Sequence, residues 1–340
     1  MAPFMSHASI LEAVSRLAEM DPLHFRDFNV PDHWQILQGT RIYENYTCAL
    51  KELERIPDGN IHIAQLQQKF AVHIVAPEAL DSFMNSQHTP KTAKAIVKTT
   101  VESPIAKQLF IAIPTEDGLQ LSSTEMRISL CLLLGVEIPL KSEICDCSAG
   151  KKLTLYHALS CKKYGQLITR HELVKEVLGE MCKAAQLSYR LEPHQAFTGN
   201  KLRPDIIVDF GKDGYDVSFD LTIHNPLRDD PSMTACIQDD QNFLRSAANT
   251  KNNKYQPNCA KNGSFFTPIV LSAFGGIADD SYTNGIKFLL DRMKNKYFSS
   301  PNWAAPDKRT YWLQRIAIAL WLGNAKQMGR FILKKPIARC

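Results

Sequence analysis

The chain of 340 residues has no apolar run that approaches the ~20 residues needed to span a bilayer, and its longest one is Ile316 to Leu322. The charged-then-apolar layout of a secretory signal peptide is missing from its N-terminal stretch. A strong excess of one charge is also missing, since the net charge is +5, which is compatible with a nucleic-acid partner without indicating one. We therefore expect a soluble intracellular protein with no membrane partner. Its nine cysteines should be thiols and metal ligands rather than disulfides.

The length and composition favour several domains with packed cores. A chain of 340 residues is long for one compact domain, and 44% hydrophobic residues can bury a core. Helical periodicity predominates early, with an amphipathic helix expected over 4–20, an irregular segment over 25–46 and another helix from Thr124 to Leu134. We expect four parts: a helical connector (1–140), a metal-binding segment (141–165), an α+β domain (166–300) and a C-terminal helix packed on the core (301–340).

Four potential metal ligands lie close together in the chain: Cys145, Cys147, His157 and Cys161. The first two bracket one residue in a turn. The last two stand four residues apart on an expected short helix, so their side chains meet. Three sulfurs and one imidazole complete a tetrahedral zinc site. Because the protein then fills every coordination position, we expect the Zn²⁺ to be structural.

Two β-rich runs joined by a Gly/Asp loop predict an antiparallel hairpin, with strands within 203–210 and 215–223 and a turn at 211–214. The second run alternates. Val217, Phe219, Leu221 and Ile223 take one face, whereas Asp216, Ser218, Asp220, Thr222 and His224 take the other. This period of two predicts a half-buried strand.

The hairpin would bring carboxylates face to face. If the four turn residues close it symmetrically, Asp205 faces Asp220 and Asp209 faces Asp216. Like charges directly opposite one another destabilise a sheet, so a compensating cation is expected. Mg²⁺ fits, because it takes oxygen ligands from one or two carboxylates and leaves room for water and a phosphate. For Asp209 and Asp216, beside the turn, a solvated face is the alternative.

A helix after Ser232 would run into Lys251, Lys254 and Tyr255, which share one face at positions i, i+3 and i+4. Lysines near a helix C-terminus are also favoured by the helix dipole, which is the ordinary explanation for them.

The remaining pattern predicts a mixed α+β arrangement. Thr169 with Glu172 forms an expected capping box for a helix. Strands are expected over 189–197 and 265–272, and helices over about 280–297 and 311–333.

These motifs resemble those of a known family. Arg203-Pro204-Asp205 and Asp220-Leu221-Thr222 resemble the Pro-Asp…(Asp/Glu)-x-Lys pattern of PD-(D/E)XK nucleases. More closely, and together with the preceding Cys-x-Cys…His-x-x-x-Cys knuckle, they resemble the restriction-like endonuclease that follows the reverse transcriptase of some non-LTR retrotransposons. One departure is Thr222, which stands where the general pattern has lysine.

The resemblance implies an α+β fold with an N-terminal helical region, a small zinc knuckle and a PD-(D/E)XK nuclease-like mixed sheet flanked by helices. It implies a Mg²⁺-dependent DNA endonuclease in which Asp205 and Asp220 hold the metal. In that family the catalytic lysine has moved to the helix after the hairpin. Lys251 is therefore our first choice and Lys254 the second, with Tyr255 orienting the lysine.

The same resemblance suggests DNA contacts from Arg170, His171, Arg203, Lys162 and Lys163. For His171, a surface position on a capped helix is the alternative. The expected partner is DNA, with RNA or a reverse transcriptase as further possibilities, and the expected location is nuclear. No reverse transcriptase motif is present. The second reading is a catalytically inactive nucleic-acid-binding relic or domesticated protein that keeps the zinc module and the fold.

Overall fold

The computed structural model describes residues 76–332 apart from 102, 111, 113–117, 135–137, 148–149, 195, 198–201, 211–213, 294–304 and 306. The expectations for 4–20 and 25–46, and most of the hairpin turn, lie outside the described residues. The chain divides into Met1–Thr89 and Pro90–Cys340. The first unit contributes one described helix, α5 (Ala76–Asn85).

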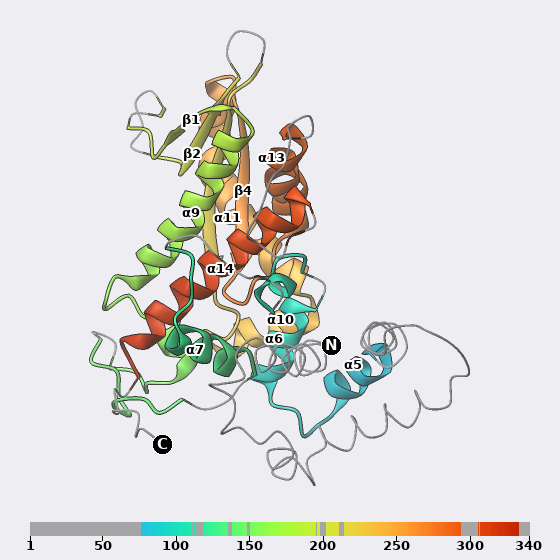
Figure 1. Cartoon of the computed structure of the whole chain (residues 1–340), viewed down its shortest axis with the longest axis vertical. Helices are drawn as coiled ribbons and strands as arrows, with labels where there is room; N and C mark the ends of the chain where they lie inside the picture. The colour runs from blue at the N-terminus through green and yellow to red at the C-terminus, as the bar shows by residue number, and fades with distance from the viewer. Residues whose placement is uncertain are drawn as a thin grey trace, which may run out of the picture. The chain divides into compact units, whose positions relative to one another are not determined.

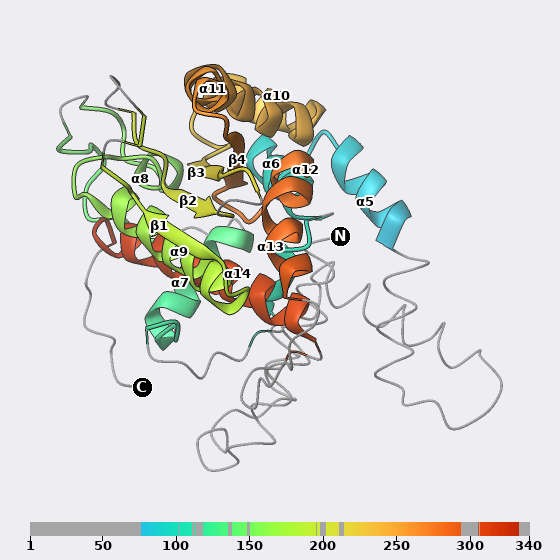
Figure 2. The ribbon, with the colours of Figure 1, turned by 90° about the horizontal axis from the view of Figure 1, so that it is seen from above.

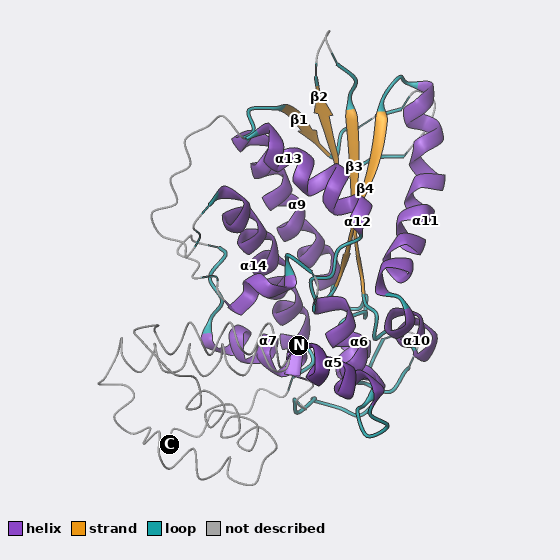
Figure 3. Ribbon diagram, turned by 90° about the vertical axis from the view of Figure 1, so that its right-hand side faces the viewer, coloured by secondary structure: helices purple, strands orange, loops and turns teal. Residues whose placement is uncertain are grey.

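A four-stranded mixed sheet forms the centre of the second unit (Figure 1, Figure 3). Its strands are β1 (Ser188–Leu191), β2 (Ile206–Asp209), β3 (Val217–His224) and β4 (Phe265–Ser272), in the order β1-β2-β3-β4. Strand β2 is antiparallel to both β1 and β3, and β4 runs parallel to β3. With the helices around it, this sheet confirms the expected α+β class.

The hairpin register is the expected one. Ile206 pairs with Phe219, and Val208 pairs with Val217. One step beyond this ladder, Asp205 is level with Asp220. Because β2 begins only at Ile206, the last residues of β3 pair with β4 alone.

The expectation of a half-buried β3 is wrong. Phe219 and Leu221 are buried, but Ser218 is also only 1% exposed and Asp220 only 4%. The alternation is present, yet helices cover both faces of the sheet, with α9 and α11 each contacting β3. The polar face of β3 is therefore an interior surface and not a solvated one.

The helices form two layers around the sheet. On one side α9 (Gln166–Ala184) packs against α14 (Lys308–Gly329), and on the other α11 (Asp240–Lys261) covers β4 and β3 (Figure 2, Figure 3). Shorter helices complete the unit: α6 (Lys91–Thr100), η2 (Ala106–Phe110), α7 (Ser123–Leu134), α8 (Leu155–Ala158), α10 (Asp230–Gln238), α12 (Asp279–Ser281), the π-helical turn η4 (Tyr282–Ile286) and α13 (Lys287–Arg292). Among the described residues, no helix combines the length and the apolar character needed to cross a membrane.

Several expected boundaries differ from the structure. Helix α9 begins after Gly165, whose φ of +68° suits glycine, so Thr169 lies inside the helix and does not cap it. The helix expected after Ser232 is two helices, because the backbone of Asp239 is extended and its side chain caps α11 by accepting a hydrogen bond from the Asn242 backbone N–H at 2.9 Å. The first strand ends at Leu191, where Glu192 adopts a φ of +42°.

The core depends on α14, which is buried around most of its circumference. Trp321, 1% exposed, is among the largest buried side chains and contacts Phe274 edge-on, with ring centroids 6.0 Å apart. Between β4 and α12 the chain turns at Gly275, where φ is +91° and a Cβ would approach the Ala106 Cα to 2.9 Å. Only glycine fits this turn without strain.

Candidate functional site

The expected metal ligands converge on one point. Thr154 caps α8 by accepting a hydrogen bond from the His157 backbone N–H at 3.0 Å, which sets the short helix that carries His157. The Sγ atoms of Cys145 and Cys161 lie 3.7 Å apart, and Cys147 Sγ lies 3.6 Å from His157 Nε2. All four ligand atoms lie within 4.8 Å of one another. This Cys₃His group could hold a metal ion such as zinc, because tetrahedral bonds of about 2.0–2.3 Å give ligand separations of this size.

The two aspartates meet where β2 begins beside β3. Asp205 Oδ2 accepts a hydrogen bond from the Leu221 backbone N–H at 2.6 Å, which holds this carboxylate against the strand that carries Asp220. The side chain of Asp205 is 15% exposed and that of Asp220 is 5% exposed. Both carboxylates are therefore largely shielded from solvent, and Asp205 is the more accessible of the two.

Lys251 reaches this pair from α11. Its Nζ lies 2.5 Å from Asp220 Oδ2, and its side chain is 24% exposed. Burial raises the pKa of Asp220, and the negative charge of Asp205 adds to the effect, whereas Lys251 and Tyr255 oppose it without cancelling it. The ionised carboxylate is therefore less favoured in the folded protein than in the unfolded chain, and further positive charge nearby would favour it.

Tyr255 and Lys254 stand next to Lys251 on the same helix. The Tyr255 hydroxyl donates a hydrogen bond to the Arg203 backbone carbonyl at 3.2 Å, and Lys254 Nζ donates to that hydroxyl at 3.2 Å. Burial and the charge of Asp220 raise the pKa of Tyr255, so the phenol stays protonated. Tyr255 therefore fixes α11 against the segment that leads into Asp205. Lys254 contacts this tyrosine, whereas Lys251 pairs directly with the Asp220 carboxylate.

His171 belongs to the carboxylate site and is not a free surface residue. Its Nε2 lies 3.2 Å from both Asp205 Oδ2 and the Leu221 carbonyl, and its Nδ1 lies 3.3 Å from Glu172 Oε1. Burial lowers the pKa of His171, but Asp205 and Glu172 outweigh it and raise the pKa overall. Since acceptors face both ring nitrogens, the imidazolium form is favoured.

Further charged residues complete the surroundings of Asp205, and the sequence motifs assigned no role to two of them, Lys175 and Glu192. Lys175, buried on α9, bonds to both Glu172 and Glu192, and Glu192 Oε2 lies 2.8 Å from Arg203 Nη2. The Glu192 backbone N–H also donates to the Asp205 carbonyl at 2.8 Å. The Glu172–Lys175 ion pair could have been predicted from the sequence, because residues three apart on one helix are neighbours. The contact of Glu192 with Lys175 could not have been predicted, because it depends on the left-handed backbone conformation of Glu192.

The expected phosphate contacts differ in their placement. Arg170 is buried, and its Nη1 donates to Asn324 Oδ1 at 2.8 Å, so the guanidinium is inside the core and a phosphate contact is contradicted. The reason is that Arg170 faces α14 from α9, next to Gly323, where a Cβ would meet its side chain. Lys163 lies 2.5 Å from Asp146 Oδ2, and Arg203 is paired with Glu192.

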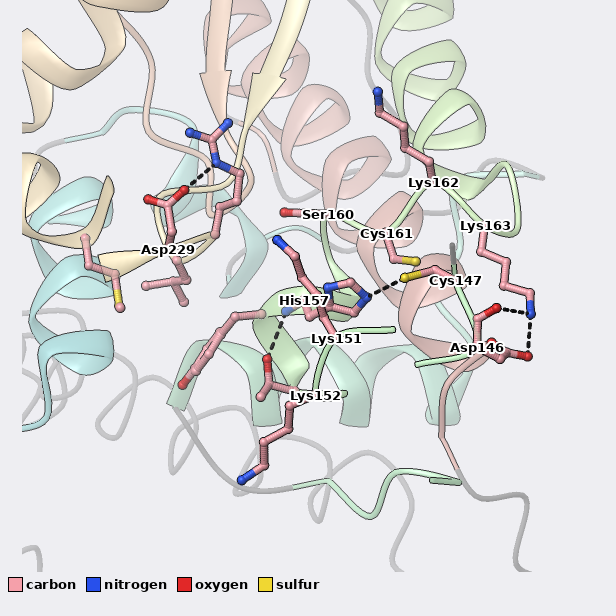
Figure 4. A pocket seen from close by; sticks show the side chains of 15 residues that line it. Asp146, Cys147, Lys151, Lys152, His157, Ser160, Cys161, Lys162, Lys163 and Asp229 are labelled. Carbon is pink, nitrogen blue, oxygen red and sulfur yellow. Dashed lines mark hydrogen bonds and ion pairs between the residues drawn. The ribbon is translucent and has the colours of Figure 1, made fainter. Parts of the chain in front are cut away.

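A hollow lies beside the Cys₃His group, between the knuckle and α10 (Figure 4). Its basic side chains are Lys151, Lys152, Lys162, Lys163 and Arg228. Of these, Lys163 is paired with Asp146, and Arg228 Nε lies 3.0 Å from Asp229 Oδ2. This hollow is separate from the carboxylate pair, which does not line it.

The raised pKa of Asp220 gives a stability prediction. When a carboxyl group has a higher pKa in the folded than in the unfolded protein, the free energy of unfolding falls as pH rises from the unfolded-state pKa to the folded-state pKa. At higher pH the protein keeps this lower stability. Asp220→Asn should therefore melt at a higher temperature than the unmodified protein at neutral pH without divalent metal. The difference should vanish below the ordinary aspartate pKa of about 4. Thermal melts across pH measure this, and an Asp220→Asn protein less stable at pH 7 would contradict it.

Comparisons with known proteins assign no family: no protein-family model matches the chain, and no curated protein sequence matches it significantly.

Proposed function

We propose that this chain is a metal-dependent DNA endonuclease of the PD-(D/E)XK type, related to the endonucleases of non-LTR retrotransposons. The observation that carries the proposal is the meeting of Asp205, directly before β2, with Asp220 on the neighbouring β3, and the Lys251 ammonium 2.5 Å from Asp220. Two carboxylates and one lysine from three separate segments are the groups that metal-assisted phosphodiester hydrolysis requires.

The order of elements supports this proposal. Helix α9, strand β1, the β2–β3 hairpin, helix α11 and strand β4 follow one another in a mixed sheet, and helix–strand–hairpin–helix is the order expected of the PD-(D/E)XK core. Asp205 stands directly before β2 and Asp220 stands within β3, which agrees with what the resemblance implies. Position 222 still holds threonine, and the lysine instead comes from the helix.

The carboxylate pair fits Mg²⁺. Asp220 is buried beside a second carboxylate that raises its pKa, so added positive charge would stabilise both ionised groups. A bound Mg²⁺ would polarise the phosphate and activate a water molecule. Asp205, which is more exposed than Asp220, would form the open side of the site toward the substrate.

The chain's own residues would orient and stabilise the reacting groups. Lys251 would turn its ammonium from Asp220 to the negative charge that develops on the phosphate, which is worth about 10²–10³-fold in rate for one well-placed donor. His171 holds Asp205 from α9 and keeps its carboxylate oriented. Tyr255 and Lys254 fix the helix from which Lys251 projects.

Nicking of supercoiled plasmid with Mg²⁺ or Mn²⁺ tests the function and distinguishes the two lysines. We expect Lys251→Ala to lower cleavage about 10²–10³-fold with little change in DNA affinity. Lys254→Ala should cut at a rate close to that of the unmodified protein, because Lys254 bonds to Tyr255 and not to a carboxylate. If Lys254→Ala lost cleavage and Lys251→Ala kept it, Lys254 would be the catalytic lysine. An unmodified protein that cuts no DNA with any divalent metal would end the nuclease assignment.

We further propose that the Cys₃His group holds a structural zinc and that the neighbouring hollow contacts DNA phosphates. Lys151, Lys152 and Lys162 all line this hollow and are exposed, so it carries three accessible cations, which project in different directions (Figure 4). Binding of duplex DNA would be independent of sequence at this surface. A nuclear location and a reverse transcriptase encoded with the chain or separately belong to the same proposal.

The salt dependence of DNA binding tests the basic surface. A protein that neutralises Z phosphates loses affinity with a slope of about 0.9Z in log–log units. Lys162→Ala should lower that slope by roughly 0.9 and weaken binding equally for unrelated sequences. Lys287→Ala, a matched removal of an exposed lysine on α13, should leave the slope unchanged. Fluorescence anisotropy titrations at several salt concentrations measure both, and a flat salt dependence of the unmodified protein would indicate a different class of partner.

The second candidate function is a nucleic-acid-binding relic that no longer cuts. The observations that favour it are Thr222 in place of the strand lysine and the direct pairing of Lys251 with Asp220, which neutralises one carboxylate without a metal. Such a protein would bind DNA with the same salt slope and would show no metal-dependent nicking.

A further inference from the structure

The knuckle is built into the core of the unit. Side chains from distant helices donate hydrogen bonds to three backbone carbonyls in and just after its short helix. Gln327 of α14 donates to the Ala158 carbonyl at 2.7 Å and to the Cys161 carbonyl at 2.9 Å, and Arg170 of α9 donates to the Leu159 carbonyl at 3.4 Å. Two of the metal ligands, His157 and Cys161, lie in this anchored segment.

The third anchor comes from the end of β3. Asn225 is 8% exposed, and its Nδ2 donates to the Tyr156 carbonyl at 2.9 Å and to Ser160 Oγ at 2.8 Å. Its Oδ1 accepts a hydrogen bond from the Leu227 backbone N–H at 3.0 Å, which turns the chain away from the strand. Every polar atom of this amide is used, and a carboxylate at this position could keep the turn but could not donate to the knuckle.

The part of β3 next to Asn225 depends on such support. From Leu221 to His224 the strand pairs with β4 on one side, while the β2 ladder has ended at Phe219. On the side that lacks β2, Leu221 is held by Asp205 and His171, and Asn225 is held by the knuckle. The strand that carries Asp220 is therefore fixed at one end by the metal-binding segment.

We infer that Asn225 is a positioning residue that couples metal binding at the Cys₃His group to the position of the end of β3, which lies directly before it. A metal ion bound to the Cys₃His group would hold His157 and Cys161 in place, these would hold the α8 turn, and Asn225 would transmit that placement to the strand. Because coupling between two sites is reciprocal, weakening the link must also loosen the metal. The bearing of this coupling on cleavage depends on the proposed nuclease function, but the coupling itself does not.

The test uses the full chain loaded with Zn²⁺ and its Asn225→Asp variant, with two readouts. Losing both donated hydrogen bonds while leaving their buried acceptors unpaired should speed Zn²⁺ transfer to a chromogenic chelator about tenfold or more. Amide hydrogen exchange at 221–224 should rise in the loaded variant to the level that chelation produces in the unmodified protein. Chelation should then add little further exchange to Asn225→Asp.

Controls separate coupling from general damage. Asn284→Asp makes the same chemical change at an exposed position in η4 and should alter neither readout. Ser160→Ala removes only one of the two acceptors and should give a smaller effect of the same sign, which keeps the test valid if Asn225→Asp folds poorly. The Co²⁺-loaded variants should keep the absorption spectrum of a Cys₃His site, which shows that the ligand set is intact.

Unchanged Zn²⁺ release together with unchanged exchange at 221–224 in Asn225→Asp would overturn the inference. Faster Zn²⁺ release without any change in amide exchange at 221–224 would also overturn it, because Asn225 would then stabilise the metal-binding segment without affecting the strand. A protein that shows the coupling but never cuts DNA would refute the proposed function and leave this inference standing.

Discussion

Replacing Asp205 or Asp220 with asparagine is expected to lower metal-dependent cleavage about 10³-fold or more, down to the background of the uncatalysed reaction. A metal ion contributes several kcal/mol of charge stabilisation to the transition state, and about 4 kcal/mol corresponds to a factor of 10³. The site exists only when both carboxylates are present, so the double variant should be no worse than either single variant. Asparagine at 205 can still accept the hydrogen bond from the Leu221 N–H, which preserves the local structure.

Asp216→Asn is the matched control for these variants. Asp216 lies just before β3, its side chain is 37% exposed, and its nearest cation is Arg190 at 4.0 Å. It should cut at close to the rate of the unmodified protein. Plasmid nicking and DNA affinity should be measured together, since the two catalytic variants should bind DNA at least as tightly once a negative charge has been removed. Full Mg²⁺-dependent cleavage by Asp205→Asn would refute the assignment of this carboxylate.

Removing the metal from the Cys₃His group should unfold the knuckle and destabilise the unit around it. In zinc modules the binding free energy of ~10–16 kcal/mol is folding free energy. Cys145, Leu153, Leu159 and Cys161 belong to the same buried cluster as the residues of α9, α14 and the sheet. Cys147→Ser or strong chelation should therefore lower the melting temperature of the whole unit and raise proteolysis around 145–161.

The metal content of the purified protein provides the direct measurement. Elemental analysis should find one zinc per chain in the unmodified protein and much less in Cys147→Ser. Cys131→Ser, which changes a half-buried thiol on α7 outside the cluster, should keep its zinc and its stability. Natively purified protein without zinc, or a Cys147→Ser protein as stable as the unmodified one, would contradict this prediction.

The sequence specified the hairpin well because its constraints are local. The turn length sets the pairing, so the level position of Asp205 and Asp220 follows from counting residues on either side of the turn. The strand Phe265–Ser272 was also predictable, since an apolar β-branched run ends in glycines. The metal cluster was predictable for the same reason, because four ligands within seventeen residues leave few arrangements.

Burial and long-range contacts were not predictable in the same way. Alternation along β3 indicated a polar face, but only the position of α11 decides that this face is covered. The burial of Arg170 could not be predicted either, because its hydrogen-bond partner Asn324 lies on α14, far away in the sequence. The Lys175–Glu192 pair depends on a left-handed residue after β1, a backbone conformation that glutamate seldom adopts.

The place of α14 in the chain bears on how the protein is made. Gln327, which holds the Ala158 and Cys161 carbonyls, follows Cys161 by 166 residues. At a synthesis rate of ~5–20 residues per second, roughly 10–30 s pass between the translation of the last metal ligand and that of its anchor. For much of this interval the thiols are already outside the ribosome while the core that will enclose them is incomplete. Zinc captured in that interval would give the nascent chain a local structure against which α9 and, last of all, α14 could pack.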